Sequence, residues 1–163
     1  MNNRDYKAKK LSLMKITKKG EYAMRAMVDL AMNYSKKRQI QEIVREEAIP
    51  ERFLEQILLT LKNAGFVESK RGVGGGYSLS RSPKEISLGE VIRVIDGPLA
   101  PLSCLDNGVQ VNCPKEVVCG IRSVVHDVAT AMTEILDNVS LAEVCDRTRG
   151  MVDKRARTLM YYI

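Results

Sequence analysis

The sequence predicts a mainly α-helical fold with one small β-hairpin, in which a winged helix-turn-helix is followed by a long helix. Three observations predict it. Two helical patterns meet at a sharp break near residues 48–50, and a glycine-rich turn separates two short β-type segments at residues 71–76. An apolar stripe then repeats at three-four spacing through residues 121–136. The 163 residues suit one domain, with or without a helical extension.

The first helix is expected to run from the N-cap residue Thr17 to about Tyr34. Its apolar residues recur at helical spacing, and the cations of residues 36–38 suit its C-terminal end. Residues 1–13 are polar and lack any period, so they are expected to form a flexible tail before a domain that begins at residue 14.

A second helix is expected over residues 41–47, followed by a tight break at Ala48 and Ile49. A third is expected over residues 50–64, with Pro50 in its first turn and Gly65 as its stop signal. Its predicted buried stripe is Phe53, Leu54, Ile57, Leu58 and Leu61. Glu51, Arg52, Glu55, Gln56 and Thr60 are left on the outward face.

Residues 66–70 and 77–80 are expected to pair as strands around the turn at residues 71–76. A hairpin directly after a helix-turn-helix makes a winged helix. Ser87 and Glu90 have the spacing of a capping box, which predicts a helix through Asp96. The winged helix-turn-helix domain is therefore expected to span residues 14–97.

A cysteine-bearing loop is expected over residues 98–120, and a long helix after it. The apolar stripe of that helix is long for a lone helix, so it predicts pairing with a second copy, whereas the alternative is packing on its own domain. The dimerisation residues are expected to be Ile121, Val124, Val125, Val128, Met132 and Ile135. A short final helix after Ser140 completes residues 121–148, and residues 149–163 are expected to be a loose tail.

The net charge of +6 is unevenly distributed. Residues 1–99 hold 19 basic and 12 acidic side chains, whereas residues 100–163 hold 7 and 8. The basic half is a candidate for binding a polyanion, although a solvated basic surface would look the same. The N-terminal part of the third helix has the order of a DNA recognition helix, and an Arg at the hairpin edge suits a minor groove. The candidate DNA-binding residues are Pro50, Glu51, Arg52, Glu55, Gln56, Lys70, Arg71, Gly72 and Gly74.

Specific base contacts are plausible for three of these side chains: Arg52 with guanine, Gln56 with adenine and Glu55 with cytosine. The alternative is that they form only a polar face, and that the hairpin is an ordinary solvated one. The glycines of the turn match neither the dinucleotide fingerprint nor a P-loop. No catalytic set is visible, so we expect no enzyme. No signal sequence or membrane span is visible, which predicts a cytoplasmic protein without a membrane partner.

Three cysteines, Cys104, Cys113 and Cys119, lie within one loop-like stretch. In a cytosolic protein, clustered thiols indicate a metal site or redox chemistry more often than disulfides. The CxxC pairs usual for structural zinc are absent, which favours a cluster or an open site. His126 follows Cys119 by two helical turns, about 10 Å, which is too far for the same small cluster. The fourth cysteine, Cys145, is expected to be a structural core residue.

Several segments resemble the Rrf-type bacterial winged-helix regulators, a family that includes IscR, NsrR, RirA and CymR. They are residues 18–23, 53–57, 65–77, 91–92 and 96–97, of which 65–77 is the most specific. The resemblance covers about residues 14–145 and implies a dimeric repressor or activator. In several branches three loop cysteines hold a [2Fe–2S] or [4Fe–4S] cluster, and Cys104, Cys113 and Cys119 occupy that place. Arg122 stands where one branch has a ligating His, and the resemblance implies Glu21 of the partner subunit as a candidate fourth ligand.

The prediction is thus a homodimeric regulator that binds a double-stranded DNA operator and senses iron, cluster supply, redox state or nitric oxide through an iron–sulfur cluster. Two alternatives remain open. One is a thiol or zinc sensor on the same DNA-binding frame, and the other is a regulator controlled by a partner protein.

Overall fold

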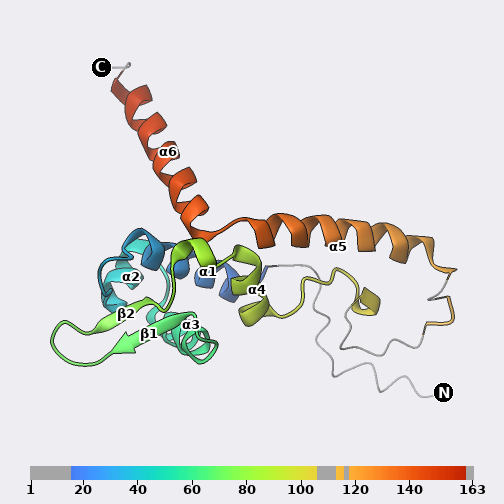
Figure 1. Cartoon of the computed structure of the whole chain (residues 1–163), viewed down its shortest axis with the longest axis horizontal. Helices are drawn as coiled ribbons and strands as arrows, with labels where there is room; N and C mark the ends of the chain where they lie inside the picture. The colour runs from blue at the N-terminus through green and yellow to red at the C-terminus, as the bar shows by residue number, and fades with distance from the viewer. Residues whose placement is uncertain (1–15, 106–112, 116–117, 161–163) are drawn as a thin grey trace. The chain divides into compact units, whose positions relative to one another are not determined.

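The computed structural model describes residues 16–105, 113–115 and 118–160. Six α-helices and one hairpin are present in these residues, as the sequence predicts (Figure 1). The chain divides into two compact units, which are described separately. One holds residues 16–97 together with the chain from residue 134 onward, and the other holds residues 98–133. The predicted tail at residues 1–13 lies outside the described residues.

The first helix, α1 (Lys18–Met32), begins as its capping signal predicts. The Thr17 hydroxyl accepts a hydrogen bond from the Gly20 backbone N–H at 3.1 Å, so one of the unpaired donors of the first turn is satisfied. Thr17 itself is held by the carboxylate of Asp96, to which its backbone N–H donates at 2.9 Å. The start of α1 is therefore fixed to the end of α4 (Leu88–Asp96), the helix that the Ser87 and Glu90 capping box begins.

Helices α2 (Ile40–Glu47) and α3 (Glu51–Asn63) form the predicted helix-turn-helix. The turn depends on Ala48, whose φ of 48° makes it the one non-glycine residue with a positive φ in the described part of the chain. Pro50 is the N-cap of α3 rather than its first helical residue, a shift of one position from the prediction. Leu54, Ile57, Leu58 and Leu61 are buried as predicted.

Phe53 was expected in the buried stripe of α3, and that prediction is wrong. Its side chain is 51% exposed and makes an edge contact with Tyr22 of α1, with ring centroids 6.3 Å apart. Four residues on, Ile57 is fully buried, so the apolar stripe narrows toward the N-terminal end of α3. Its neighbour Leu54 is fully buried, so Phe53 lies at the edge of the apolar stripe, where it packs against Tyr22 and stays half in solvent.

Strands β1 (Val67–Lys70) and β2 (Gly76–Leu79) pair antiparallel as the predicted wing, with Val67 opposite Leu79. The hairpin is joined to the rest of the domain at Arg38, whose backbone exchanges two hydrogen bonds of 2.8 Å with Tyr77. This contact requires Gly76. Its φ is +144°, and a Cβ there would lie 2.6 Å from the Arg38 carbonyl oxygen.

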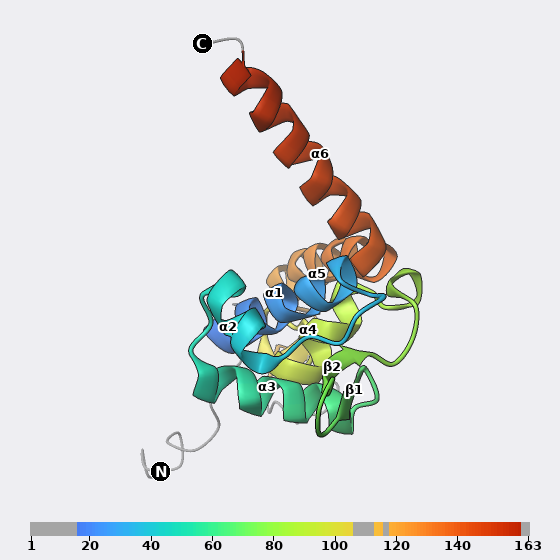
Figure 2. The ribbon, with the colours of Figure 1, turned by 90° about the vertical axis from the view of Figure 1, so that its left-hand side faces the viewer.

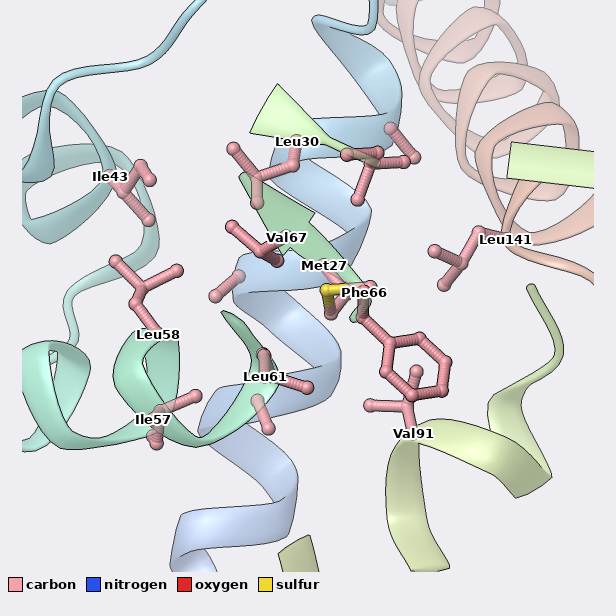
Figure 3. Packing of buried hydrophobic residues seen from close by; sticks show 14 of the residues in the cluster. Met27, Leu30, Ile43, Ile57, Leu58, Leu61, Phe66, Val67, Val91 and Leu141 are labelled. Atoms are coloured by element: carbon pink, nitrogen blue, oxygen red, sulfur yellow. The ribbon is translucent and has the colours of Figure 1, made fainter. Parts of the chain in front are cut away.

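The core of this unit is aliphatic and is drawn from all of its elements (Figure 3). Met27 and Leu30 of α1 meet Leu58 and Leu61 of α3 and Val91 of α4. The chain from Val139 onward joins the same core, because Leu141 is fully buried and its backbone N–H donates to the Ile86 carbonyl at 2.9 Å. Cys145 is 3% exposed, as expected of a core cysteine, and burial raises the pKa of its thiol.

One ion pair is embedded beside this core. The Arg38 guanidinium donates two hydrogen bonds of 3.1 Å to the carboxylate of Asp29, the one buried charged side chain in the described residues. Glu46 of α2 accepts a further bond from Arg38 at 2.5 Å. Arg38 therefore joins α1, α2 and the wing.

The long helix α5 (Gly120–Asn138) forms where it was predicted, after the short 3₁₀ turn η3 (Ser103–Leu105) and the loop. None of its residues, all of which lie in the described part, is buried. Its end is attached to the first unit, because Asp137 pairs with Arg93 of α4 at 2.5 Å.

The last helix is much longer than predicted. Helix α6 runs from Leu141 to Met160, so neither the end expected near Arg147 nor the loose tail from residue 149 is present through residue 160. Cations and acids spaced three or four residues apart, such as Glu143 with Arg147 at 2.5 Å, stabilise its exposed part. The described residues contain no helix that is both long enough and apolar enough to span a bilayer.

Candidate nucleic-acid interface and cysteine segment

The outward face of α3 carries the polar residues that the sequence predicts for it. Glu51, Arg52, Glu55 and Gln56 are all exposed, and Pro50 is exposed at the cap. Within the described residues no ion pair joins Arg52 to Glu55. Glu51 is different, because its carboxylate accepts a hydrogen bond from Gln41 of α2 at 3.3 Å.

The wing presents a basic edge beside this face. Lys70, Arg71, Gly72 and Gly74 are exposed, and the two glycines have φ values of +93° and +71° that allow the tight tip. Figure 2 shows the hairpin next to the C-terminal end of α3, with α6 extending away from the opposite side of this unit. The predicted residues of α3 and the wing thus lie on one side of the unit.

Between α3 and the wing lies a hollow of about 260 Å³, here called the helix–wing hollow. It is lined by Leu59 and Lys62 of α3 and by Ser69, Lys70, Arg71 and Tyr77 of the hairpin. The sequence reasoning missed Leu59, Lys62, Ser69 and Tyr77. The positions of Leu59 and Lys62, one and two turns after Glu55, would have placed them on the outward face of α3, but their meeting with the hairpin depends on tertiary structure.

The three loop cysteines form no disulfide with one another in the described residues, and they differ in exposure. Cys104 and Cys119 are half-buried, whereas Cys113 is exposed. Residues 106–112 and 116–117 of the predicted loop lie outside the described residues. Within the part that is described, no three His, Cys, Asp or Glu side chains gather as a metal-binding group. The donor chemistry fits a soft metal or an iron–sulfur cluster, but the described residues do not form a closed ligand set.

Arg122 links two of these cysteines. Its backbone N–H donates to the Cys119 sulfur at 3.4 Å, and its guanidinium donates to the Cys104 carbonyl oxygen at 3.3 Å. The first and third cysteines are therefore held around one arginine at the start of α5. N–H donors to a cysteine sulfur adjust the reduction potential of a cluster that the sulfur holds.

Glu21, the candidate fourth ligand, lies in the first turn of α1 and already has cationic neighbours. Its carboxylate pairs with Lys18 at 2.7 Å and with Arg25 at 3.8 Å. The hydrogen bond from Lys18 lowers the pKa of Glu21, so the carboxylate is ionised at neutral pH. Its side chain is 42% exposed to solvent.

Over most of its length the chain is similar to known transcriptional regulators. A family model described as "Iron-dependent Transcriptional regulator", Rrf2, matches residues 16–147. An Rrf2-like HTH-type transcriptional regulator of Rhodobacter capsulatus is 39% identical over 136 residues, which are 79% of this chain and 91% of that one. The HTH-type transcriptional regulator CymR of Bacillus subtilis is 32% identical over 151 residues, which are 92% of this chain and 100% of CymR.

Solved structures show the same similarity to regulators of this kind. The structure of B. subtilis CymR, described as the global cysteine regulator, superposes with a TM-score of 0.70 at 30% identity and covers 82% of this chain and 97% of that one. The structure of T. potens IscR superposes with a TM-score of 0.66 at 30% identity and covers 82% and 88%.

Proposed function

The chain belongs to the Rrf2 family of DNA-binding transcriptional regulators, and we propose that it is a homodimer that reads a specific operator and senses its signal through the three cysteines Cys104, Cys113 and Cys119. The observation that carries the sensor proposal is the pair of cysteines held by Arg122 directly before α5. The relatives are regulators and not enzymes, which agrees with the expectation of no catalytic activity.

In the proposed complex, α3 enters the major groove with its N-terminal end first, and the wing reaches the adjacent minor groove. Arg52 contacts guanine, Gln56 contacts adenine and Glu55 accepts from cytosine. The exposure of these side chains, and the lack of an ion-pair partner for Arg52 in the described residues, support this assignment. A base-reading arginine must present an unengaged fork of donors.

Replacing Arg52 with alanine is expected to weaken binding selectively, by about 1–3 kcal/mol where a bidentate guanine contact is lost. The measurement is selection and affinity determination with a library of randomised duplexes. The wild-type protein should show a guanine preference that Arg52→Ala removes. Arg155→Ala is the matched control, because Arg155 is an exposed helical arginine on α6, away from α3. An equal loss on all duplexes would show that Arg52 touches only phosphate.

The proposed sensor is an iron–sulfur cluster held by Cys104, Cys113 and Cys119. Such a cluster would supply an oxidisable group whose presence depends on iron supply, cluster supply, redox state or nitric oxide. Arg122 orients Cys119 and Cys104 for this role and does not itself ligate. Glu21 of a second subunit is the proposed fourth ligand, and its existing contacts with Lys18 and Arg25 would make that ligand exchangeable.

Signal transfer is proposed to use α5. This helix begins at Gly120, one residue after Cys119, and its last turn pairs with α4 through Asp137 and Arg93. A change in the thiols therefore acts on the start of an element whose end is bonded to the DNA-binding unit. The expected result is a shift between two dimer geometries that differ in operator affinity.

Dimerisation is proposed to bury the exposed apolar side of α5. Ile121, Val124, Val128 and Ile135 are between 50% and 71% exposed in the single chain, with Val125 and Met132 half-buried beside them. A helix with so many exposed aliphatic side chains gains stability when it is covered by an equivalent helix. Because the same patch serves both subunits, a two-fold arrangement is expected.

A thiol or zinc sensor is the second candidate, favoured by the three accessible thiols and by the similarity to CymR. Anaerobic purification with iron, acid-labile sulfide and zinc analysis separates the candidates. The cluster proposal predicts a coloured protein with stoichiometric iron and sulfide that bleaches in air. A colourless protein that contains zinc, or contains no metal but forms a disulfide in air, would contradict the cluster and favour the second candidate.

A further inference from the structure

We propose that the helix–wing hollow binds one phosphate of the DNA backbone together with its deoxyribose, and that Lys62 is the main phosphate-contacting residue. This inference rests on the proposed DNA-binding function and adds a residue set and a ligand group to it. The ligand would lie between the two proposed DNA-contacting elements, because α3 forms one wall of the hollow and the wing forms the other.

Charge is the first argument. Lys62, Lys70 and Arg71 surround the hollow, and in the described part of the chain no carboxylate lies within ion-pair distance of any of them. Elsewhere in the same unit, arginines such as Arg25, Arg81 and Arg93 each have an acidic partner. Three unpaired cations around one concave surface favour an anion, because their mutual repulsion is relieved when one is bound.

The second argument is the orientation of Lys62. Its Nζ donates to the Ser69 hydroxyl at 2.6 Å across the hollow, so the flexible side chain is directed toward the wing and not into solvent. An ammonium group has three donors, and this contact uses one of them. The remaining two are available for phosphate oxygens. Ser69 therefore acts as a positioning residue for Lys62.

The third argument is an exposed apolar side chain that the core does not explain. Leu59 is 59% exposed on α3, where an apolar residue gains nothing from solvent. It lines the hollow together with the half-buried Tyr77. A phosphate with a sugar attached presents both an anionic and an apolar surface, and this combination matches a hollow lined by cations and by Leu59. A free inorganic anion would leave Leu59 uncovered.

Geometry then favours DNA as the source of the phosphate. When α3 occupies a major groove and the wing lies at the adjacent minor groove, one backbone strand must pass between them. The strand passes through the hollow. Contacts with backbone phosphates fix the register of a protein on the duplex but carry no sequence information. The hollow would therefore align α3 for its base contacts.

The test is Lys62→Gln, which keeps length and polarity but removes the charge from an exposed residue. Affinity should fall by the same factor on every duplex that the wild-type protein binds. The slope of log affinity against log salt should become shallower by about 0.9 for each protomer that contacts DNA. Ser69→Ala should change the slope in the same direction by less. Lys154→Gln on α6 is the matched control and should leave the slope unchanged.

Two further arms identify the source of the phosphate. Duplexes with single methylphosphonate substitutions should reveal one position per half-site at which the wild-type protein is weakened and Lys62→Gln is not. Inorganic phosphate, titrated at constant ionic strength, should not compete. If Lys62→Gln retains the wild-type salt slope, or changes only the response to inorganic phosphate, the inference is overturned while the DNA-binding proposal stands. If the wild-type protein binds no duplex, the proposed function itself fails.

Discussion

Replacing Arg38 with leucine is expected to lower the free energy of unfolding by about 3–5 kcal/mol at neutral pH, because it leaves the buried charge of Asp29 without its partner. The Asp29 side chain is 3% exposed and that of Arg38 is 11% exposed, so solvent cannot replace the lost hydrogen bonds. Glu46 adds to the effect, since its charge repels an unpaired Asp29. The segment at Arg38 that holds the wing through Tyr77 should loosen as well.

The loss should depend on pH, and its sign follows from the protonation of Asp29. Burial raises the pKa of Asp29 above its ordinary value of 3.8, although the hydrogen bonds from Arg38 act in the opposite direction. The folded protein therefore keeps this proton to a higher pH than the unfolded chain does. Protonation of Asp29 therefore contributes to the free energy of unfolding in full below pH 3.8, and this contribution is lost as the pH rises through the pKa of Asp29 in the folded protein. Without Arg38 the pKa of Asp29 in the folded protein is higher still. The loss of unfolding free energy caused by Arg38→Leu should therefore grow as the pH rises and Asp29 ionises.

Urea unfolding of both proteins between pH 4 and pH 8, at one fixed protein concentration, measures this deficit. Adding Asp29→Asn to Arg38→Leu should recover part of the loss, because it removes the buried charge. Arg147→Leu is a suitable control, since Arg147 pairs with Glu143 at the same 2.5 Å as Arg38 with Glu46 but is 61% exposed. It should cost at most about 1 kcal/mol. A deficit of Arg38→Leu that stays constant with pH would exclude the charge of Asp29 as its cause.

The second large effect is expected at the cysteines. Alanine at Cys104, Cys113 or Cys119 should each reduce bound iron and sulfide by at least about tenfold, since even the loss of a residue that only supports a ligand costs 10–100-fold in metal affinity. The colour of the anaerobic protein should be lost in parallel. The affinity of the purified variants for the selected operator should equal that of the wild-type protein after exposure to air.

Cys145→Ala provides the matched control, because Cys145 is a buried core thiol and not part of the loop. It should retain wild-type iron and lose only about 1 kcal/mol of stability. Should all three loop variants keep both iron and operator response, the cysteine sensor would be wrong. A regulator controlled by a partner protein would then be the better description. Loss of the response with no change in metal content would instead favour a thiol sensor.

Local signals in the sequence were sufficient to predict most of the fold. Thr17 at α1 and the capping box of Ser87 and Glu90 at α4 act within one helical turn, so neighbouring residues determine them. The glycine turn and the break at Ala48 are local in the same sense. Phe53 was misassigned because helical periodicity places it beside the buried Leu54 and Ile57 but does not show where the edge of the core lies, which depends on tertiary packing. The length of α6 was underestimated because its exposed turns are stabilised by ion pairs and lack a strong apolar stripe.

The candidate site was predictable in its residue types but not in its assembly. Exposed Arg52 and Gln56 follow from helical periodicity, and the three cysteines follow from their count and spacing. The contact of Lys62 with Ser69 does not, because it joins α3 to the wing across a fold-dependent gap. The sequence shows Arg122 only as the residue that stands where one branch of the family has a ligating His, whereas its backbone and guanidinium contacts with the cysteine segment emerge only in three dimensions.

The continuity of α5 has a consequence for insertions and deletions. Between Gly120 and Asn138 the helix is unbroken, so each inserted residue rotates everything before it by about 100° about the helix axis relative to everything after it. Seven residues restore the direction to within about 20°. Changes of chain length between Cys119 and Asp137 therefore keep the same angular phase only in steps such as seven, eleven or eighteen residues. An engineered change in the spacing from Cys119 to Asp137 is thus expected to preserve the relation of the two helix ends only at those lengths.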